Sequence, residues 1–194
     1  MSSSAYNPDI HRRRSIRLRE FDYSAAGGYF VTTCVHNREC LFGEVCDDVM
    51  VLNDAGGLVE SVWNDLVKRF PTIELDAFVV MPNHVHFIVN IVNAAIKDGE
   101  GQDRAGRDRA PTLDEIVRVF KSISAAQVNR LLSRTGQPLW QRNYYERVIR
   151  NDSELYGFRD YIIHNPLKWP DDKENPILIR RGAASARPPL GICL

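Results

Sequence analysis

Two histidines separated by a single residue are the first feature of this sequence with an evident chemistry. His84 and His86 lie in a short run of β-branched and apolar residues that predicts a strand, His84–Asn90. Side chains at positions i and i+2 of a strand point to the same face, so the two imidazoles project side by side. Neutral imidazoles placed in this way are suited to chelating a divalent metal. The pattern is equally compatible with two exposed histidines on an edge strand.

A tyrosine and an asparagine form the second candidate pair. Tyr161 and Asn165 are four residues apart in a segment with helical spacing of its apolar residues, so they share one face of the predicted helix. Tyrosine serves as a nucleophile in covalent catalysis, and the side-chain oxygen of asparagine is a hard metal ligand. The alternative is structural: a tyrosine at the edge of the core, and an asparagine that ends the helix before Pro166.

A third segment, 140–150, interleaves aromatic and basic side chains. Its aromatic residues are Trp140, Tyr144 and Tyr145, and its arginines are Arg142, Arg147 and Arg150. Aromatic faces stack unpaired bases while arginines hold phosphates, which is how proteins grip single-stranded nucleic acid. A strand with its aromatic residues in the core and its arginines outside explains the same pattern.

The elements that must position these residues follow from hydrophobic periodicity and capping signals. The resulting order is strand, helix, two strands, helix, strand and a further helix. This order predicts an α+β fold, a ferredoxin-like split βαβ sandwich with an antiparallel sheet and helices on one face, plus a C-terminal helix that carries Tyr161. The predicted strands are Tyr29–His36, Leu75–Met81, His84–Asn90 and an extended segment within Trp140–Ile149. The predicted helices are Leu58–Phe70, a helix opened by a capping box at Thr112–Glu115, and a last helix from Asn151 to Asn165. A hairpin is predicted within Leu41–Leu52.

The length of 194 residues predicts one domain with additional segments. We expect a basic N-terminal arm over 1–27, one catalytic domain over 28–170 with a charged loop insert at 97–110, and an irregular C-terminal tail over 171–194.

The charge of the chain is balanced but uneven. Lys plus Arg and Asp plus Glu both number 25, so the net charge is zero, which argues against partner capture by bulk attraction. Residues 11–19, however, hold five arginines and no acid, and residues 142–150 hold three arginines against Glu146. Neutrality therefore does not exclude nucleic acid but predicts a confined footprint.

Membrane and export signals are not apparent. No apolar run approaches the roughly 18 residues of a membrane span, and the first residues have no apolar segment typical of a signal peptide. The four cysteines lack C-x-x-C spacing and are expected to be reduced thiols. We therefore expect a cytoplasmic protein without a membrane partner.

These motifs together resemble a known family. Met81–His86 and Asp160–Lys168 are similar to the single-tyrosine HUH transposases, in particular to the branch associated with repetitive extragenic palindromes. The segments Arg12–Leu18, Tyr29–Thr32 and Trp140–Arg142 also resemble that branch, so the similarity runs with gaps from about residue 12 to residue 170. The resemblance implies that His84, His86 and Asn165 hold a metal and that Tyr161 is the nucleophile, in preference to Tyr144 and Tyr145.

The resemblance also implies a function. We expect a DNA strand transferase that cleaves and rejoins single-stranded or hairpin (palindromic) DNA through a 5′-phosphotyrosine intermediate, with Mg²⁺ or Mn²⁺, as a monomer or homodimer. Two alternatives stay open: a hairpin-binding protein that does not cleave, and a metal-dependent phosphohydrolase that uses water in place of Tyr161. The expected DNA contacts are Arg12, Arg13, Arg14, Arg17, Arg19, Trp140, Arg142, Tyr144, Arg147, Arg150 and Lys168.

Overall fold

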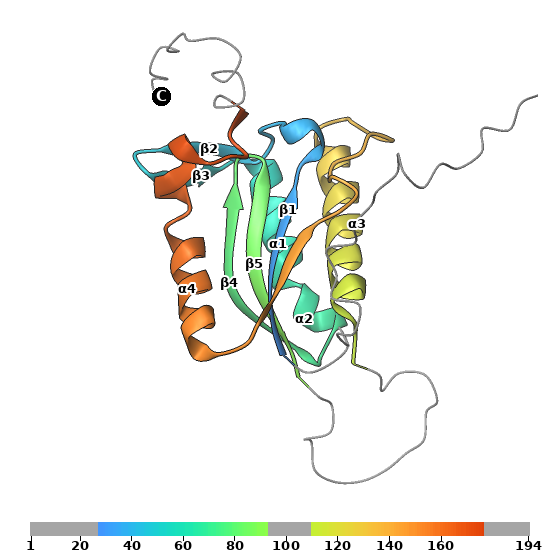
Figure 1. Cartoon of the computed structure of the whole chain (residues 1–194). Coiled ribbons are helices and arrows are strands. Elements are labelled where there is room, and N and C mark those ends of the chain that lie inside the picture. The colour runs from blue at the N-terminus through green and yellow to red at the C-terminus, as the bar shows by residue number, and fades with distance from the viewer. Residues whose placement is uncertain (1–26, 93–109, 177–194) are drawn as a thin grey trace, which may run out of the picture.

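The computed structural model describes residues 27–92 and 110–176, and its centre is an antiparallel sheet (Figure 1). The four strands of this sheet lie in the order β4-β5-β1-β6, and each neighbouring pair is antiparallel. Their bounds are β1 (Gly27–Cys34), β4 (Ile73–Met81), β5 (His84–Ile91) and β6 (Tyr145–Ile149). This is the strand order of a ferredoxin-like sheet, so the α+β prediction is confirmed.

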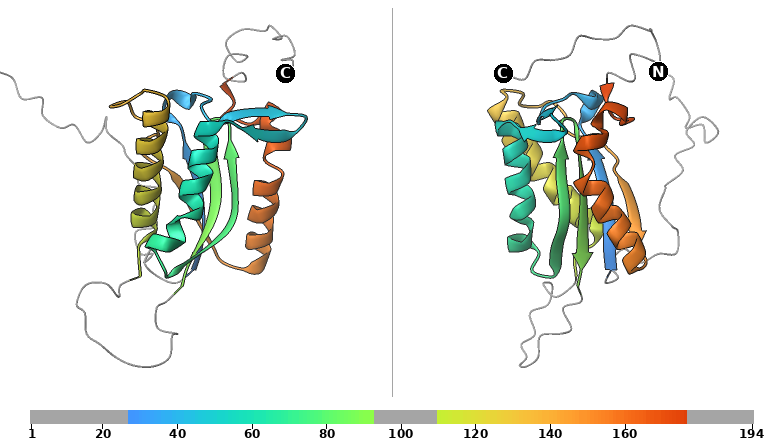
Figure 2. Two further views of the ribbon diagram at one scale, coloured as in Figure 1. Left: turned by 180° about the vertical axis from the view of Figure 1, so that it is seen from behind. Right: turned by 90° about the vertical axis from the view of Figure 1, so that its left-hand side faces the viewer.

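Helices cover both faces of the sheet (Figure 2). α1 (Asp54–Asn64) and α3 (Leu113–Leu131) pack on one face, with the short α2 (Leu66–Arg69) continuing from α1. α4 (Asp152–Ile163), the predicted C-terminal helix, packs on the opposite face, and the short 3₁₀ helix η2 (Pro166–Asp171) follows it. The site that α4 carries therefore lies across the sheet from the other helices.

Local signals account for the boundaries of the helices. α1 begins four residues before the predicted start because Asn53 caps it, accepting a hydrogen bond from the Gly56 amide at 3.0 Å. At α3 the predicted capping box is present: the Thr112 hydroxyl accepts from the Glu115 amide, and the Glu115 carboxylate accepts from the Thr112 amide. Asn151 caps α4 as expected, accepting from the Glu154 amide at 2.9 Å.

The predicted hairpin is also present, as β2 (Gly43–Cys46) paired with β3 (Val49–Leu52). Asp47 and Asp48 form its turn with φ values of 48° and 63°. Two consecutive residues with positive φ are typical of the tight turn whose twist matches that of the flanking strands. The 3₁₀ helix η1 (His36–Arg38) lies between β1 and this hairpin.

Alternation along β5 divides the interior into two parts. Val85, Phe87 and Val89 belong to the main core under α1 and α3, where the Phe87 ring lies 4.6 Å from that of Trp63. Ile88 belongs to a small cluster under α4. His84 and His86 have the same parity as Ile88 and so face α4.

Among residues 27–92 and 110–176, none of the helices combines the length and the hydropathy that a bilayer crossing requires. Cys34 and Cys40 are free thiols, whereas Cys46 is disulfide-bonded, so the expectation of four reduced thiols is wrong for Cys46. Most of the predicted basic arm, the charged insert and the C-terminal tail lies outside the described residues.

Candidate active site

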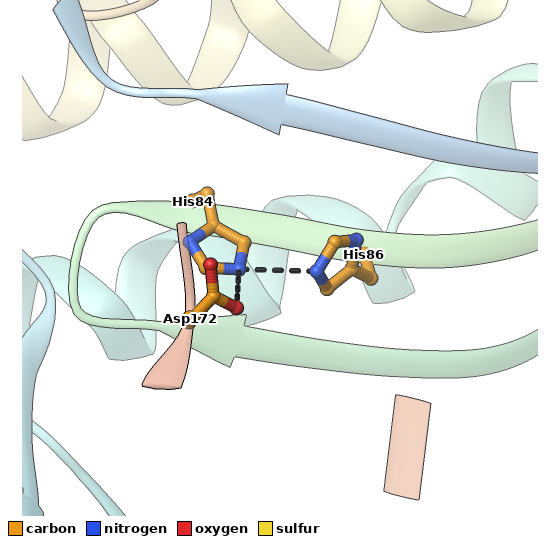
Figure 3. A group of neighbouring side chains, drawn as sticks. All are labelled: His84, His86 and Asp172. Atoms are coloured by element: carbon orange, nitrogen blue, oxygen red, sulfur yellow. Dashed lines mark hydrogen bonds and ion pairs between the residues drawn. The ribbon is translucent and has the colours of Figure 1, made fainter. Parts of the chain in front are cut away.

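The two histidines of the H-x-H pattern meet at the start of β5 (Figure 3). They lie on the same face of the sheet as Ile88, which packs under α4. Their Nε2 atoms are 3.0 Å apart, and His84 is fully buried while His86 is 4% exposed. The alternative of two exposed histidines on an edge strand is wrong, because β5 is an inner strand covered by α4.

The hydrogen bonds of Asn83 determine which nitrogen of His84 carries the proton. The Asn83 amide nitrogen donates to the carbonyl oxygens of Arg38 at 3.1 Å and of Glu174 at 2.7 Å. The Asn83 oxygen therefore faces His84 Nδ1, 2.9 Å away, and accepts its hydrogen. His84 Nε2 is left as a lone pair that points toward His86.

His86 has a partner that accommodates either tautomer. Its Nδ1 lies 2.7 Å from the hydroxyl of Thr32, which both donates and accepts. When the hydroxyl donates, His86 Nε2 carries a hydrogen that bonds to His84. When the hydroxyl accepts, the Nε2 atoms of His84 and His86 both have lone pairs, and these atoms are 3.0 Å apart. This is the separation expected for two nitrogens that each lie about 2.1 Å from one metal ion, with a nitrogen–metal–nitrogen angle of about 90°.

Burial keeps both rings neutral. Desolvation lowers the pKa of His84 to about 4, against a smaller opposing effect of the Glu174 carboxylate. Desolvation, followed by the neighbouring His84, lowers the pKa of His86 well below its usual value. Neutral imidazole is the form that binds metals, so the pair is a ready ligand at neutral pH.

Asn165 lies beside His84 and is the candidate third donor. The helix was predicted to reach Asn165, but α4 ends at Ile163 and its C-cap His164 has φ −92° and ψ 9°, so Asn165 lies just beyond the helix. Its side chain nevertheless lies near enough to Tyr161 to influence the phenol. Asn165 is 1% exposed, and neither atom of its amide has a hydrogen-bond partner among the residues that the structure describes. A buried amide without a partner is costly, and a bound cation would satisfy its oxygen.

Tyr161 lies against this donor set. Its ring is edge-on to His86 at 5.1 Å and to Phe30 at 5.9 Å, and the Lys168 ammonium lies 5.9 Å from the ring centre. Burial raises the pKa of the phenol, the Asp172 carboxylate raises it further, and the Asn165 side chain opposes both. The phenol is therefore protonated at neutral pH and needs a base or a cation to become nucleophilic.

A cavity of about 420 Å³ opens in front of Tyr161. One wall is aromatic and the end near His86 is polar and charged. The lining residues are Phe30, Thr32, Cys34, His86, Gln141, Asn143, Tyr144, Tyr145, Phe158, Tyr161, Asp172, Lys173 and Glu174. A planar apolar group can stack on the aromatic wall of such a space.

The competing tyrosines differ from Tyr161 in their surroundings. The Tyr144 hydroxyl donates to Asp114 of α3 at 2.6 Å, and burial together with this acid raises its pKa far above the usual value. Tyr145 is 45% exposed on the cavity rim. The structure therefore favours Tyr161, which alone among the three adjoins Asn165 and the histidines.

Trp140 requires a correction. The sequence predicted a base-stacking surface, but Trp140 is 7% exposed, and its indole nitrogen donates to Ser124 at 2.9 Å. Its ring contacts Phe42 and Phe120, at 5.3 and 5.8 Å between ring centres. The core interpretation of this residue holds, and Trp140 is removed from the DNA-contact set.

The other basic candidates lie on the surface. Arg147 lies over the ring of Phe158 at 5.9 Å, and Lys168 adjoins Tyr161. Arg142, Arg147, Arg150 and Lys168 are all exposed. Arg12, Arg13, Arg14, Arg17 and Arg19 lie outside the described residues.

Asp172 was not predicted from the sequence as a site residue. This acid follows η2, and its Oδ2 atom lies 3.9 Å from His84 Nε2 (Figure 3). The ligand atoms of Asp172, His84 and His86 all lie within 4.8 Å of one another. The only signal in the sequence was an acidic pair, Asp171-Asp172, shortly after Asn165, and that pair was assigned to an irregular tail.

Proteins of two bacteria are similar to this chain. An uncharacterized protein of Haemophilus influenzae is 37% identical over 180 residues, which cover 88% of the chain and 97% of that protein. A second protein of the same organism, provisionally named a REP-associated tyrosine transposase, is 25% identical over 148 residues, 76% of the chain and 74% of that protein. The REP-associated tyrosine transposase of Escherichia coli K12 is 29% identical over 102 residues, 53% of the chain and 49% of that protein. The chain is thus a relative of proteins named REP-associated tyrosine transposases.

The fold is also that of such a protein. The structure of a REP-associated tyrosine transposase bound to a REP hairpin matches 84% of the chain and 82% of that protein, with a TM-score of 0.51 and 21% identity. No protein-family model matches the chain.

Proposed function

We propose that this protein is a DNA strand transferase, which cleaves and rejoins single-stranded or hairpin DNA through Tyr161 with the help of a divalent metal. The observation that carries the proposal is the placement of Tyr161 against His86 and beside Asn165, a buried amide without a hydrogen-bond partner among the described residues. The names of the relatives support a transposase, and one structural neighbour is bound to a REP hairpin.

The donor set fits a divalent cation. His84 and His86 present Nε2 atoms 3.0 Å apart, and Asn165 has an amide oxygen free to bind. We propose that these three residues hold Mg²⁺ or Mn²⁺, because the amide oxygen is a hard ligand that those ions accept. When bound, the ion would polarise a non-bridging phosphate oxygen and stabilise the charge of the transition state.

Tyr161 performs the covalent step. Its phenol loses a proton, and the oxygen attacks the scissile phosphorus in line. The bond from phosphorus to the 3′ oxygen breaks, and the leaving oxygen takes up a proton as a free 3′-OH. The 5′-phosphotyrosine retains the energy of the phosphodiester, so the reverse attack by a 3′-OH rejoins DNA without ATP. With a usual pKa of about 10, a phenol is also a better leaving group than an alkyl alcohol.

The surroundings of Tyr161 suit an unpaired DNA strand. Arg142, Arg147, Arg150 and Lys168 are exposed cations that we assign to the phosphates, and Tyr144 contributes to the wall of the cavity. The aromatic wall suits a base that has left its stack. Residues 12–19 remain a predicted extension of this contact surface.

We propose that one chain assembles its own active site. The Arg159 side chain on α4 donates two hydrogen bonds to Asp76 on β4, at 2.8 and 2.6 Å, and so docks the tyrosine helix on its own sheet. This arrangement supports action by a monomer, with a homodimer as the alternative. The cytoplasmic location stays a prediction.

The test uses hairpin DNA labelled at the end that stays with the adduct. The labelled DNA is incubated with protein and Mg²⁺ or Mn²⁺ and then denatured. We expect a covalent protein–DNA band that EDTA and Tyr161→Phe both abolish and that Tyr144→Phe preserves. Cleavage that persists in Tyr161→Phe contradicts the proposal and favours a phosphohydrolase. Binding without cleavage under either metal contradicts it in favour of a recognition protein.

A further inference from the structure

The segment after η2 places an acid on the metal-binding face of the histidine pair (Figure 3). The side chain of Asp172 is 8% exposed, and its two oxygens have different surroundings. Oδ1 accepts a hydrogen bond from the Glu174 amide at 2.7 Å. Oδ2 is directed to His84 Nε2 at 3.9 Å, too far for a hydrogen bond. One oxygen is thus held by the backbone while the other faces the histidines.

The segment that carries Asp172 is tied to the rest of the site by several hydrogen bonds. The Glu174 carbonyl accepts from Asn83 at 2.7 Å, and the Glu174 carboxylate accepts from the Arg38 guanidinium at 2.7 Å. Asn175, which is 4% exposed, donates from its side chain to the Trp169 carbonyl at 2.9 Å and from its backbone to the Asp172 carbonyl at 2.9 Å. These contacts set the position of residues 172–175 relative to the sheet.

Asn83 links the two halves of this arrangement. The same side chain orients His84 through its oxygen and holds Glu174 through its nitrogen. Because His84 Nδ1 carries the hydrogen, the atom that faces the Asp172 carboxylate is a lone pair. A lone pair and a largely buried carboxylate repel each other, and the charge is costly to bury unless a cation lies between them.

We propose that Asp172 is a further protein ligand of the divalent cation, together with His84, His86 and Asn165. Its carboxylate supplies the negative charge that the two imidazoles and the amide lack, and hard divalent ions favour carboxylate oxygen. The hydrogen bonds of Asn83 and Arg38 to Glu174 make residues 172–175 part of the active site. This inference rests on the proposed metal site, but not on the cleavage of DNA.

The test measures metal binding directly, with the full chain and without DNA. Mn²⁺ is titrated into the metal-free protein, and free Mn²⁺ is followed by its electron paramagnetic resonance signal. We expect Asp172→Asn to weaken Mn²⁺ affinity by more than about tenfold. Asp171→Asn is the matched control: it removes the same charge at the neighbouring, exposed position and should leave the affinity unchanged.

A comparison of unfolding midpoints in EDTA confirms that both variants fold. If Asp172→Asn binds Mn²⁺ as tightly as Asp171→Asn, or if the wild-type chain binds no Mn²⁺, the inference is wrong. Failure of the proposed function gives a different result. In that case Mn²⁺ binding still depends on Asp172, but the protein forms no covalent DNA adduct.

Discussion

The two faces of the sheet differ in what they bury. The face under α1 and α3 holds a large apolar core, in which Trp63 stacks on Phe78 at 5.1 Å and meets Phe87 at 4.6 Å. The face under α4 has a small apolar cluster centred on Phe30 and Ile162, and next to it lie the buried polar groups of the site. Successive residues of β5 thus belong to opposite environments.

The difference separates stability from chemistry. The main core gains free energy from apolar burial, whereas the α4 face buries His84, His86 and Asn165 at a desolvation cost. Buried polar groups that are only partly satisfied are typical of sites that await a ligand. We therefore expect substitutions on the first face to act on folding and those on the second to act on metal and DNA.

The sharpest comparison uses two neighbouring residues of β5. Phe87→Ala removes a fully buried ring and should lower the free energy of unfolding by about 3–5 kcal/mol. His86→Ala should cost less, about 1–3 kcal/mol in EDTA, since it removes a hydrogen bond to Thr32 rather than a large apolar surface. Urea titrations measure both.

The metal response should show the opposite order. Mn²⁺ should raise the unfolding midpoint of Phe87→Ala, provided that it folds, because a ligand of the native state stabilises it. Mn²⁺ should leave His86→Ala unchanged. If Phe87→Ala and His86→Ala lower the free energy of unfolding equally and respond equally to Mn²⁺, the distinction between the two faces is wrong.

The next largest effect concerns the contact that docks α4. The Arg159 guanidinium, through its hydrogen bonds, holds the pKa of Asp76 below its usual value of 3.8. A carboxyl with a lowered pKa stabilises the fold above that value, and this contribution is lost as the pH falls through the lower pKa of the folded state. We expect Asp76→Asn to lower the unfolding midpoint at pH 7, by less than Phe87→Ala, and the difference from wild type to shrink progressively as the pH falls below 3.8.

Asp65→Asn is the control for this measurement. Asp65 pairs with Lys68 on the surface, where both side chains are exposed, so its loss should change the midpoint little. Equal effects of the two substitutions would show that the Asp76–Arg159 pair does not dock the helix.

The smallest expected effect is that of Tyr144→Phe. The Tyr144 hydroxyl faces α3 and donates to Asp114, so its removal should cost about 1 kcal/mol of unfolding free energy. It should leave the yield of the covalent DNA adduct unchanged. A loss of adduct without a loss of stability would show that the Tyr144 hydroxyl takes part in the chemistry.

Much of the fold was predictable because its signals are local. The capping box at Thr112, the cap at Asn151 and the alternation in β5 each depend on residues within a few positions of one another. Helical spacing also predicted that Tyr161 and Asn165 would be neighbours, although α4 ends two residues before Asn165. These signals place the H-x-H pair and the tyrosine helix, and the order of elements brings them to one sheet.

What escaped prediction depends on contacts between distant segments. Asn83 bonds to Glu174, 91 positions away, and this contact helps to place Asp172 by the histidines. Trp140 was predicted to be a surface aromatic because Arg142 is close to it in the sequence. In the fold, α3 packs over Trp140 through Ser124 and Phe120 and buries it. Neither result follows from spacing, since each depends on which elements pack together.

The central claim is that Tyr161 is the residue that becomes bonded to DNA. The most direct measurement traps the adduct, trims the DNA with nuclease, digests the protein with trypsin and locates the nucleotide by mass spectrometry. The peptide 160–168 contains one tyrosine, Tyr161, whereas Tyr144 and Tyr145 fall in 143–147 and Tyr156 falls in 151–159. The account predicts a phosphonucleotide on peptide 160–168. A nucleotide on either of the other peptides, or cleaved DNA with no modified peptide, would contradict it.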